Sequence, residues 1–84
     1  MRKVLIAFDS TQQALRAETL LEFLGIDLDT RPTPKAITAG CALSIDFPMD
    51  DFPLVQETFK REHVEIKGFY YEKNGQYISF EGEK

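Results

Sequence analysis

The sequence predicts an α+β domain with a ferredoxin-like split βαβ fold, in which two helices cover one face of an antiparallel sheet. Strand-like segments and two amphipathic helical patterns follow one another in the order βαββαβ. An Asn-Gly pair then adds a C-terminal hairpin strand. A chain of 84 residues with 43% hydrophobic content can bury one modest core. We therefore expect residues 1–84 to form a single domain.

The first strand is predicted over residues 3–8, because Val4 to Phe8 are apolar without a break. A strand that is apolar on both faces usually lies in the interior of its sheet. Ser10 is expected to cap a helix, with Gln13 completing a capping-box pattern, and Gly25 is expected to end that helix. Its apolar face consists of Ala14, Ala17, Leu21 and Leu24.

Two further strands are predicted on either side of a proline-containing segment. Residues 26–30 alternate between apolar and polar, and Pro32 and Pro34 end this strand. Thr33 is then placed to cap a single helical turn that Gly40 ends. From Cys41 the alternation resumes as far as residue 47, which predicts a half-buried third strand.

A second helix is predicted to begin at Asp50 or Asp51, because carboxylates suit the positive end of the helix dipole. Pro53 is tolerated in its first turn. At the other end, His63 is expected to be a solvated residue whose charge suits the helix C-terminus. The buried stripe of this helix consists of Phe52, Val55 and Phe59.

The chain is predicted to end in a hairpin. Residues 64–71 form a fourth strand with a bulge at Gly68, and the Asn74-Gly75 turn leads into an edge strand over residues 76–80. The face of the sheet without helices then needs cover, and a homodimer through the sheet face or edge is one way to provide it. The residues expected on that face include Leu5, Ala42, Ser44, Phe69, Tyr71 and Tyr77.

Composition excludes several classes of partner. The net charge of −4 and the pI near 4.9 disfavour binding to nucleic acid or to an anionic membrane surface. The longest apolar run is too short to span a bilayer or to serve as a secretory signal. A single cysteine without such a signal favours a reducing, cytoplasmic compartment.

Cys41 is the one cysteine of the chain, so it is the main candidate for chemistry. A lone thiol forms no internal disulfide and supplies too few ligands for a structural metal site, and no cofactor motif is visible. Two interpretations stay open. Cys41 is either a small buried residue in phase with its apolar neighbours or a reactive group whose thiolate is the nucleophile.

The remaining polar candidates have simpler explanations. Asp9 and Ser10 follow the first strand, where helix capping accounts for them. Asp46, Asp50 and Asp51 lack the regular ligand ladder of a calcium loop. A single histidine, His63, has no partner at a metal-binding spacing.

Several segments of the sequence resemble the putative selenium/sulfur carrier protein-like family. The resemblance extends over residues 3–71 and rests on the opening Val-Leu-Ile-Ala-Phe-Asp-Ser-Thr, on Leu24-Gly25-Ile26, on Thr33-Pro34-Lys35-Ala36-Ile37 and on Cys41-Ala42-Leu43. Two departures stand out. Ala42 occupies a position at which the family usually has glycine, and the C-terminal hairpin extends past the usual end of the family.

The resemblance implies a cytoplasmic carrier, rather than a turnover enzyme, that accepts a persulfide or selenide on Cys41 and passes it to an acceptor protein. The implied donor is a cysteine desulfurase or a selenocysteine lyase, and the carrier needs no cofactor of its own. Arg31 and Lys35 would supply positive charge that tunes the thiol, and Thr33 and Pro34 would shape the loop. Gly40 and Ala42 are the immediate neighbours of the thiol in the chain. The alternative is a regulatory or scaffold domain that binds a small ligand or a protein partner, with Cys41 as core packing.

Overall fold

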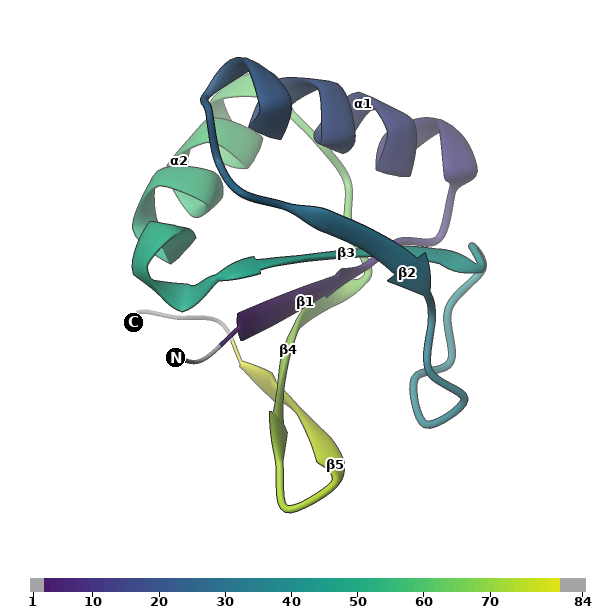
Figure 1. Ribbon diagram of the computed structural model, residues 1–84. Helices are drawn as coiled ribbons and strands as arrows, with labels where there is room; N and C mark the ends of the chain where they lie inside the picture. Colours follow the sequence, from purple (N-terminus) through teal and green to yellow (C-terminus); the bar gives the residue numbers. More distant parts are fainter. Residues whose placement is uncertain (1–2, 81–84) are drawn as a thin grey trace.

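A computed structural model describes residues 3–80 and shows a five-stranded antiparallel sheet with two helices on one face (Figure 1). The elements are β1 (Lys3–Ala7), α1 (Thr11–Phe23), β2 (Asp29–Pro32), β3 (Leu43–Pro48), the 3-10 turn η1 (Met49–Asp51), α2 (Phe52–Glu62), β4 (Gly68–Lys73) and β5 (Gln76–Phe80). The strand order β2-β3-β1-β4-β5 is the split βαβ order with one strand added. The predicted fold class is therefore confirmed.

Strand β1 lies in the middle of the sheet, as its apolar sequence predicts. It pairs with β3 on one side and with β4 on the other, both antiparallel. Val4 and Ile6 point toward the helices and are fully buried, whereas Leu5 and Ala7 are buried on the opposite face. Four consecutive residues of one strand thus contribute to two separate apolar clusters.

Helix α1 begins and ends at the predicted signals, with one difference. The Ser10 side chain accepts a hydrogen bond from the Gln13 backbone N–H at 3.4 Å, and Gly25 adopts φ +77° just beyond the helix. The Gln13 side chain does not complete the capping box. Its Oε1 instead accepts from the backbone N–H of Glu65, 52 residues away, at 3.2 Å.

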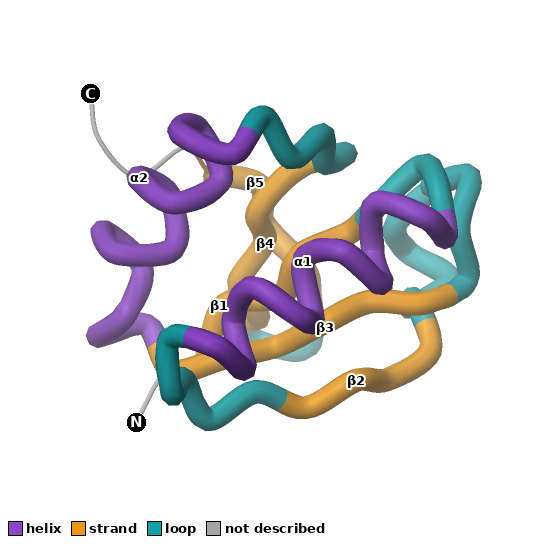
Figure 2. The backbone as a smooth tube through the Cα atoms, turned by 90° about the horizontal axis from the view of Figure 1, so that it is seen from above, coloured by secondary structure: helices purple, strands orange, loops and turns teal. Residues whose placement is uncertain are grey.

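The main core lies between the sheet and the helices, which cross over the strands in the view from above (Figure 2). Ala14 and Ala17 are fully buried, so α1 lies close to the sheet. From α2, the rings of Phe52 and Phe59 contact Phe69 of β4, with centroid distances of 4.8 Å and 6.4 Å. These contacts confirm the predicted buried stripe of α2 and correct the predicted face of Phe69, because its register opposite Ile6 turns it toward the helices.

The starts of four predicted elements move in the structure, and the fourth strand starts at Gly68 rather than at residue 64. The second strand starts at Asp29 rather than at Ile26, because Ile26 and Leu28 already pack into the core as part of the connection from α1. The third strand starts at Leu43, two residues after Cys41. Helix α2 starts at Phe52, because residues 49–51 form a 3-10 turn in which Asp51 makes no side-chain cap.

The C-terminal hairpin follows the predicted turn. Asn74 and Gly75 both have positive φ, +53° and +79°, as a type I′ turn requires, and β5 lies at the edge of the sheet. The predicted bulge at Gly68 is absent. Gly68 opens β4 in regular register with Ala7. Neither helix of the described residues 3–80 has the length and apolar character needed to cross a membrane.

The face of the sheet without helices is called the open face below. The loop between β2 and β3 hangs on this side in Figure 1, and its residue Ile37 packs against Leu5 and Ala7 in a small second cluster. Tyr70 and Tyr77 pack against the same cluster. The chain therefore covers part of the open face itself, and the homodimer stays a prediction.

Candidate functional site

Thr33 connects the two ends of the loop that precedes Cys41. The Thr33 backbone N–H donates to the carbonyl of Ala42 at 2.8 Å, and its hydroxyl donates to the carbonyl of Cys41 at 3.1 Å. The same hydroxyl also contacts the Ser44 hydroxyl. Thr33 thus joins the two ends of the loop and does not cap a helical turn.

Within the loop, Pro34 begins a reverse turn in place of the predicted helical turn. The backbone N–H of Ile37 donates to the Pro34 carbonyl at 3.0 Å, which leaves Lys35 at the exposed tip. Ile37 of this turn is buried against Leu5 and Ala7 on the open face, so the loop packs on that side of the sheet.

Cys41 is fixed by the chain that leaves β1. Its backbone N–H donates to the Phe8 carbonyl at 3.0 Å, and the preceding Gly40 N–H donates to the Asp9 carboxylate at 3.0 Å. A Cβ on residue 40 would lie 2.6 Å from the Asp9 carbonyl oxygen. Glycine is required here for a close approach of two backbones, rather than for ending a helical turn as predicted.

The sulfur of Cys41 has two polar neighbours. The Leu43 backbone N–H donates to Sγ at 3.3 Å, and the Thr11 hydroxyl lies 3.3 Å from Sγ, where either group can donate. Cys41 is a free cysteine with 3% of its surface exposed, and it packs into the main core. When the sulfur is a thiolate, both neighbours act as donors to it.

Cys41 nevertheless contributes to the wall of a surface depression, called the thiol hollow below. The hollow has a volume of about 470 Å³ and opens beside the N-terminus of α1 and the edge strand β2. Its lining includes Thr11, Arg31, Pro32, Cys41, Ala42 and Leu43. Cys41 therefore packs into the main core and also contributes to the lining of this hollow.

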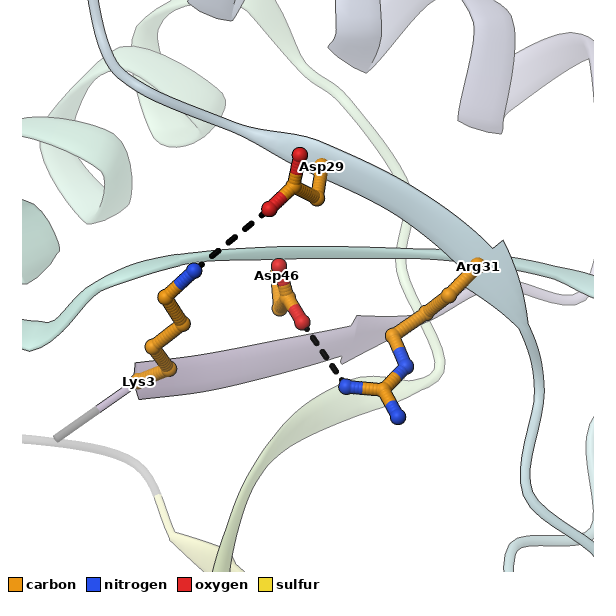
Figure 3. Close-up of polar contacts among 4 residues, drawn as sticks. All are labelled: Lys3, Asp29, Arg31 and Asp46. Carbon is orange, nitrogen blue, oxygen red and sulfur yellow. Dashed lines mark hydrogen bonds and ion pairs between the residues drawn. The ribbon is translucent and has the colours of Figure 1, made fainter.

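The structure separates the two cations that the sequence placed near the thiol. Arg31 contributes to the thiol hollow, but its guanidinium donates to the Asp46 carboxylate at 2.9 Å on the open face (Figure 3). This hydrogen bond is the main reason why the pKa of Arg31 is raised. Lys35 is exposed at the tip of the loop. The hydrogen bonds found at the sulfur come from neutral groups.

The other sequence candidates do not gather around Cys41. His63 is exposed at the end of α2 with φ +59°, a left-handed helix end. The Asp46 side chain is buried and paired with Arg31, while Asp50 and Asp51 lie in the 3-10 turn. Among residues 3–80, no three side chains of the types His, Cys, Asp and Glu come together closely enough to hold a metal ion.

Two residues at the site were missed by the sequence reasoning. Thr11 reaches the sulfur across 30 residues of sequence, and Asp9 binds the Gly40 N–H across 31. Both follow β1 directly, in the segment that was explained as a helix cap. The order of the strands in the predicted fold could have indicated both residues. Strands β1 and β3 are antiparallel neighbours, so the end of β1 meets the start of β3.

These features define a class of protein, namely a ferredoxin-like domain with one free cysteine in the wall of a surface hollow. Within that class, the chain belongs to the family described as "Putative Se/S carrier protein-like", whose model matches residues 3–71. The match covers most of the chain and includes Cys41 with its neighbours. No curated protein and no solved structure matches the chain.

Proposed function

We propose that this protein carries a sulfur or selenium atom on Cys41 and transfers it from a donor protein to an acceptor. The observation that carries the proposal is the place of the sulfur, at the thiol hollow and within 3.3 Å of two hydrogen-bond donors. Membership of the Se/S carrier family supports it. Because one thiol holds one cargo atom, the protein acts as a carrier and not as a turnover enzyme.

The loading step is a thiol–persulfide exchange. The Cys41 thiolate attacks the terminal sulfur of a donor persulfide, the donor S–S bond breaks, and the donor leaves as a thiolate that takes up the proton lost by Cys41. One S–S bond forms while one breaks, so the exchange has no net oxidation. With a selenium cargo, the donor S–Se bond breaks and a Cys41 S–Se bond forms in the same way.

The residues around the sulfur suit this step. The Leu43 N–H and the Thr11 hydroxyl stabilise a thiolate by charge-assisted hydrogen bonds. Thr33 holds the Cys41 carbonyl and thereby fixes the backbone on which the thiol stands. A persulfide adds a sulfur atom about 2 Å beyond Sγ, so the cargo extends into the hollow, where an acceptor thiolate can reach it.

Burial of Cys41 determines the kind of partner. With 3% of the residue exposed, the donor must place its terminal sulfur inside the hollow. A cysteine desulfurase or selenocysteine lyase with a persulfide, or with a selenium atom bound to a cysteine sulfur, on a mobile segment meets this requirement. We place both proteins in the cytoplasm, where a free thiol stays reduced, and expect no nucleic acid or membrane partner at a net charge of −4.

The proposal is tested by incubating the purified protein with a cysteine desulfurase and cysteine, followed by intact-mass spectrometry. The expected product carries one additional sulfur, which reductant removes and which peptide mapping assigns to Cys41. The Cys41→Ser variant is expected to gain no mass. If the wild-type protein gains no sulfur from the desulfurase and no selenium from a selenocysteine lyase, the carrier proposal is wrong.

The competing function has its own supporting observation. Cys41 packs among the apolar residues of the main core, as a structural cysteine does. Alkylation by iodoacetamide separates the two functions. A carrier thiol reacts in the native protein, and the ratio of the native to the denatured rate is expected to be higher with this small reagent than with a bulky maleimide. A thiol that reacts only after denaturation belongs to a scaffold or regulatory domain.

A further inference from the structure

A second depression lies on the open face and is called the open-face cavity below. Its volume is about 330 Å³, within the range of small-molecule sites. It is distinct from the thiol hollow, although Arg31 contributes to both. The residues used in the argument are Lys3, Leu5, Arg31, Asp46, Glu72 and Tyr77.

One wall of the cavity presents a positioned guanidinium group. Arg31 extends from β2 over the sheet, and one of its terminal nitrogens donates to Asp46 Oδ2, while the other points away from Asp46 (Figure 3). The Asp46 side chain is 8% exposed and the Arg31 side chain 49%. The acceptor of this hydrogen bond is therefore buried, whereas the donor side chain remains accessible to solvent. A guanidinium has five N–H groups in a fixed fork, and those not facing Asp46 remain able to bind a carboxylate.

The second cation of the cavity is already partnered. Lys3 forms an ion pair with Asp29 at 3.4 Å, to the side of the Arg31–Asp46 pair (Figure 3). We assign the anionic group to Arg31, because its planar guanidinium fork matches a carboxylate and keeps N–H groups that point away from Asp46. A purely anionic ligand would also meet the Asp46 carboxylate, whose Oδ1 is buried without a hydrogen-bond partner among the described residues.

The opposite wall carries negative charge on an apolar base. Glu72 of β4 and Tyr77 of β5 are direct cross-strand partners, and Tyr77 packs against Leu5. Both lie close enough to Arg31 to affect the pKa of its guanidinium group. The pKa of Arg31 is raised mainly by its hydrogen bond to Asp46, against the opposing effect of burial, and Tyr77 and Glu72 contribute in the same direction as Asp46. The cavity thus has a cation on one side, an anion on the other and Leu5 between them.

We propose that the open-face cavity binds a free α-amino acid with an apolar side chain. Its carboxylate pairs with the outer N–H groups of Arg31, its ammonium with Glu72, and its side chain lies on Leu5 and the ring of Tyr77. Asp46 is a positioning residue, because it acts on the ligand only through Arg31. A zwitterion satisfies both walls, whereas a simple anion or a simple cation leaves one wall facing a like charge.

The first experiment is an NMR titration of the full chain with L-leucine, L-methionine and L-phenylalanine at millimolar concentrations. At least one is expected to give saturable shifts at the backbone amides of Leu5, Arg31 and Tyr77. Leucinamide, which lacks the carboxylate, and 4-methylpentanoate, which lacks the ammonium, are each expected to bind about 10-fold or more weakly. Absence of saturable shifts with all three amino acids overturns the proposal, and so does binding of either leucine analogue as tightly as leucine itself.

Matched variants test the two walls separately. Glu72→Gln and Arg31→Met are each expected to weaken binding about 10-fold or more, whereas the exposed α2 controls Glu57→Gln and Lys60→Met are expected to leave it unchanged. Glu72 is exposed, so its variant tests the site even if Arg31→Met unfolds. Unchanged affinity in Glu72→Gln overturns the proposed pose. Sulfur loading of Cys41 has no part in this titration, so the carrier proposal and this one fail independently.

Discussion

The two faces of one sheet differ in how they use the same strands. On the helix side, β1 contributes Val4 and Ile6 to a dry core, and the sulfur of Cys41 at its margin has two neutral hydrogen-bond partners. On the open face, the same strand contributes Leu5 beneath two ion pairs that connect β1, β2 and β3. The contacts at the sulfur therefore come from a backbone N–H and a hydroxyl group, whereas the ion pairs between strands lie on the other side of the sheet.

The largest expected effect tests whether the helix side carries most of the stability. Ile6→Ala removes a fully buried side chain from the main core and is expected to lower the free energy of unfolding by about 3–4 kcal/mol. Leu5→Ala affects the smaller cluster with Ala7 and Ile37 and is expected to cost about 2 kcal/mol. Urea unfolding of both variants gives the comparison. Equal losses would mean that the open-face cluster is as tightly packed as the main core.

The next effect concerns the loop that connects the two faces. Gly40→Ala places a Cβ 2.6 Å from the Asp9 carbonyl oxygen, a backbone atom that cannot turn aside, and is expected to cost about 1–3 kcal/mol. The matched control is Gly68→Ala, whose Cβ would have its nearest neighbour, the ring of Tyr70, at 3.5 Å and which we expect to be nearly neutral. Thermal unfolding measures both. A neutral Gly40→Ala variant would show that the Asp9 contact is not tight.

A comparison of the two ion pairs on the open face follows in size. Arg31→Met leaves the buried Asp46 carboxylate without its donor and is expected to cost about 1–3 kcal/mol. Lys3→Met breaks the pair with Asp29, in which both side chains are well exposed, and is expected to cost about 0.5 kcal/mol or less. Urea unfolding at low and high salt separates them, because only the exposed pair is strongly screened. Equal and salt-sensitive losses would mean that Asp46 is not effectively buried.

The sequence predicted those features that depend on neighbouring residues. Ser10, Gly25 and the Asn74-Gly75 turn were correct because capping and positive φ are local requirements. The period of the apolar residues likewise predicted the face of α2 that is buried, but one position of register was enough to misplace Phe69 on the sheet. Local pattern cannot fix the pairing of strands that lie far apart in sequence.

The candidate site was predicted only in its central residue. Cys41 was found because the chain has one cysteine, whereas its neighbour Thr11 lies 30 residues away. Arg31 was predicted to lie near the thiol because it is close to Cys41 in sequence. The pairing of β2 with β3 instead lets its guanidinium group donate to the Asp46 carboxylate. Side chains on neighbouring strands meet through register, and register follows from the whole fold rather than from any segment.

The smallest expected effect tests the neutral surroundings of the thiol. Thr11→Val removes the hydroxyl near Sγ while keeping its shape, and Thr11→Ser keeps the hydroxyl. Thr11 is exposed, so both variants are expected to lose about 0.5 kcal/mol of stability or less. One lost hydrogen bond to a thiolate is expected to slow iodoacetamide alkylation of native Cys41 by roughly 3–10-fold in Thr11→Val, with little change in Thr11→Ser. If both variants react at the wild-type rate, the Leu43 N–H alone supports the thiolate, and the proposed role of α1 in the site is wrong.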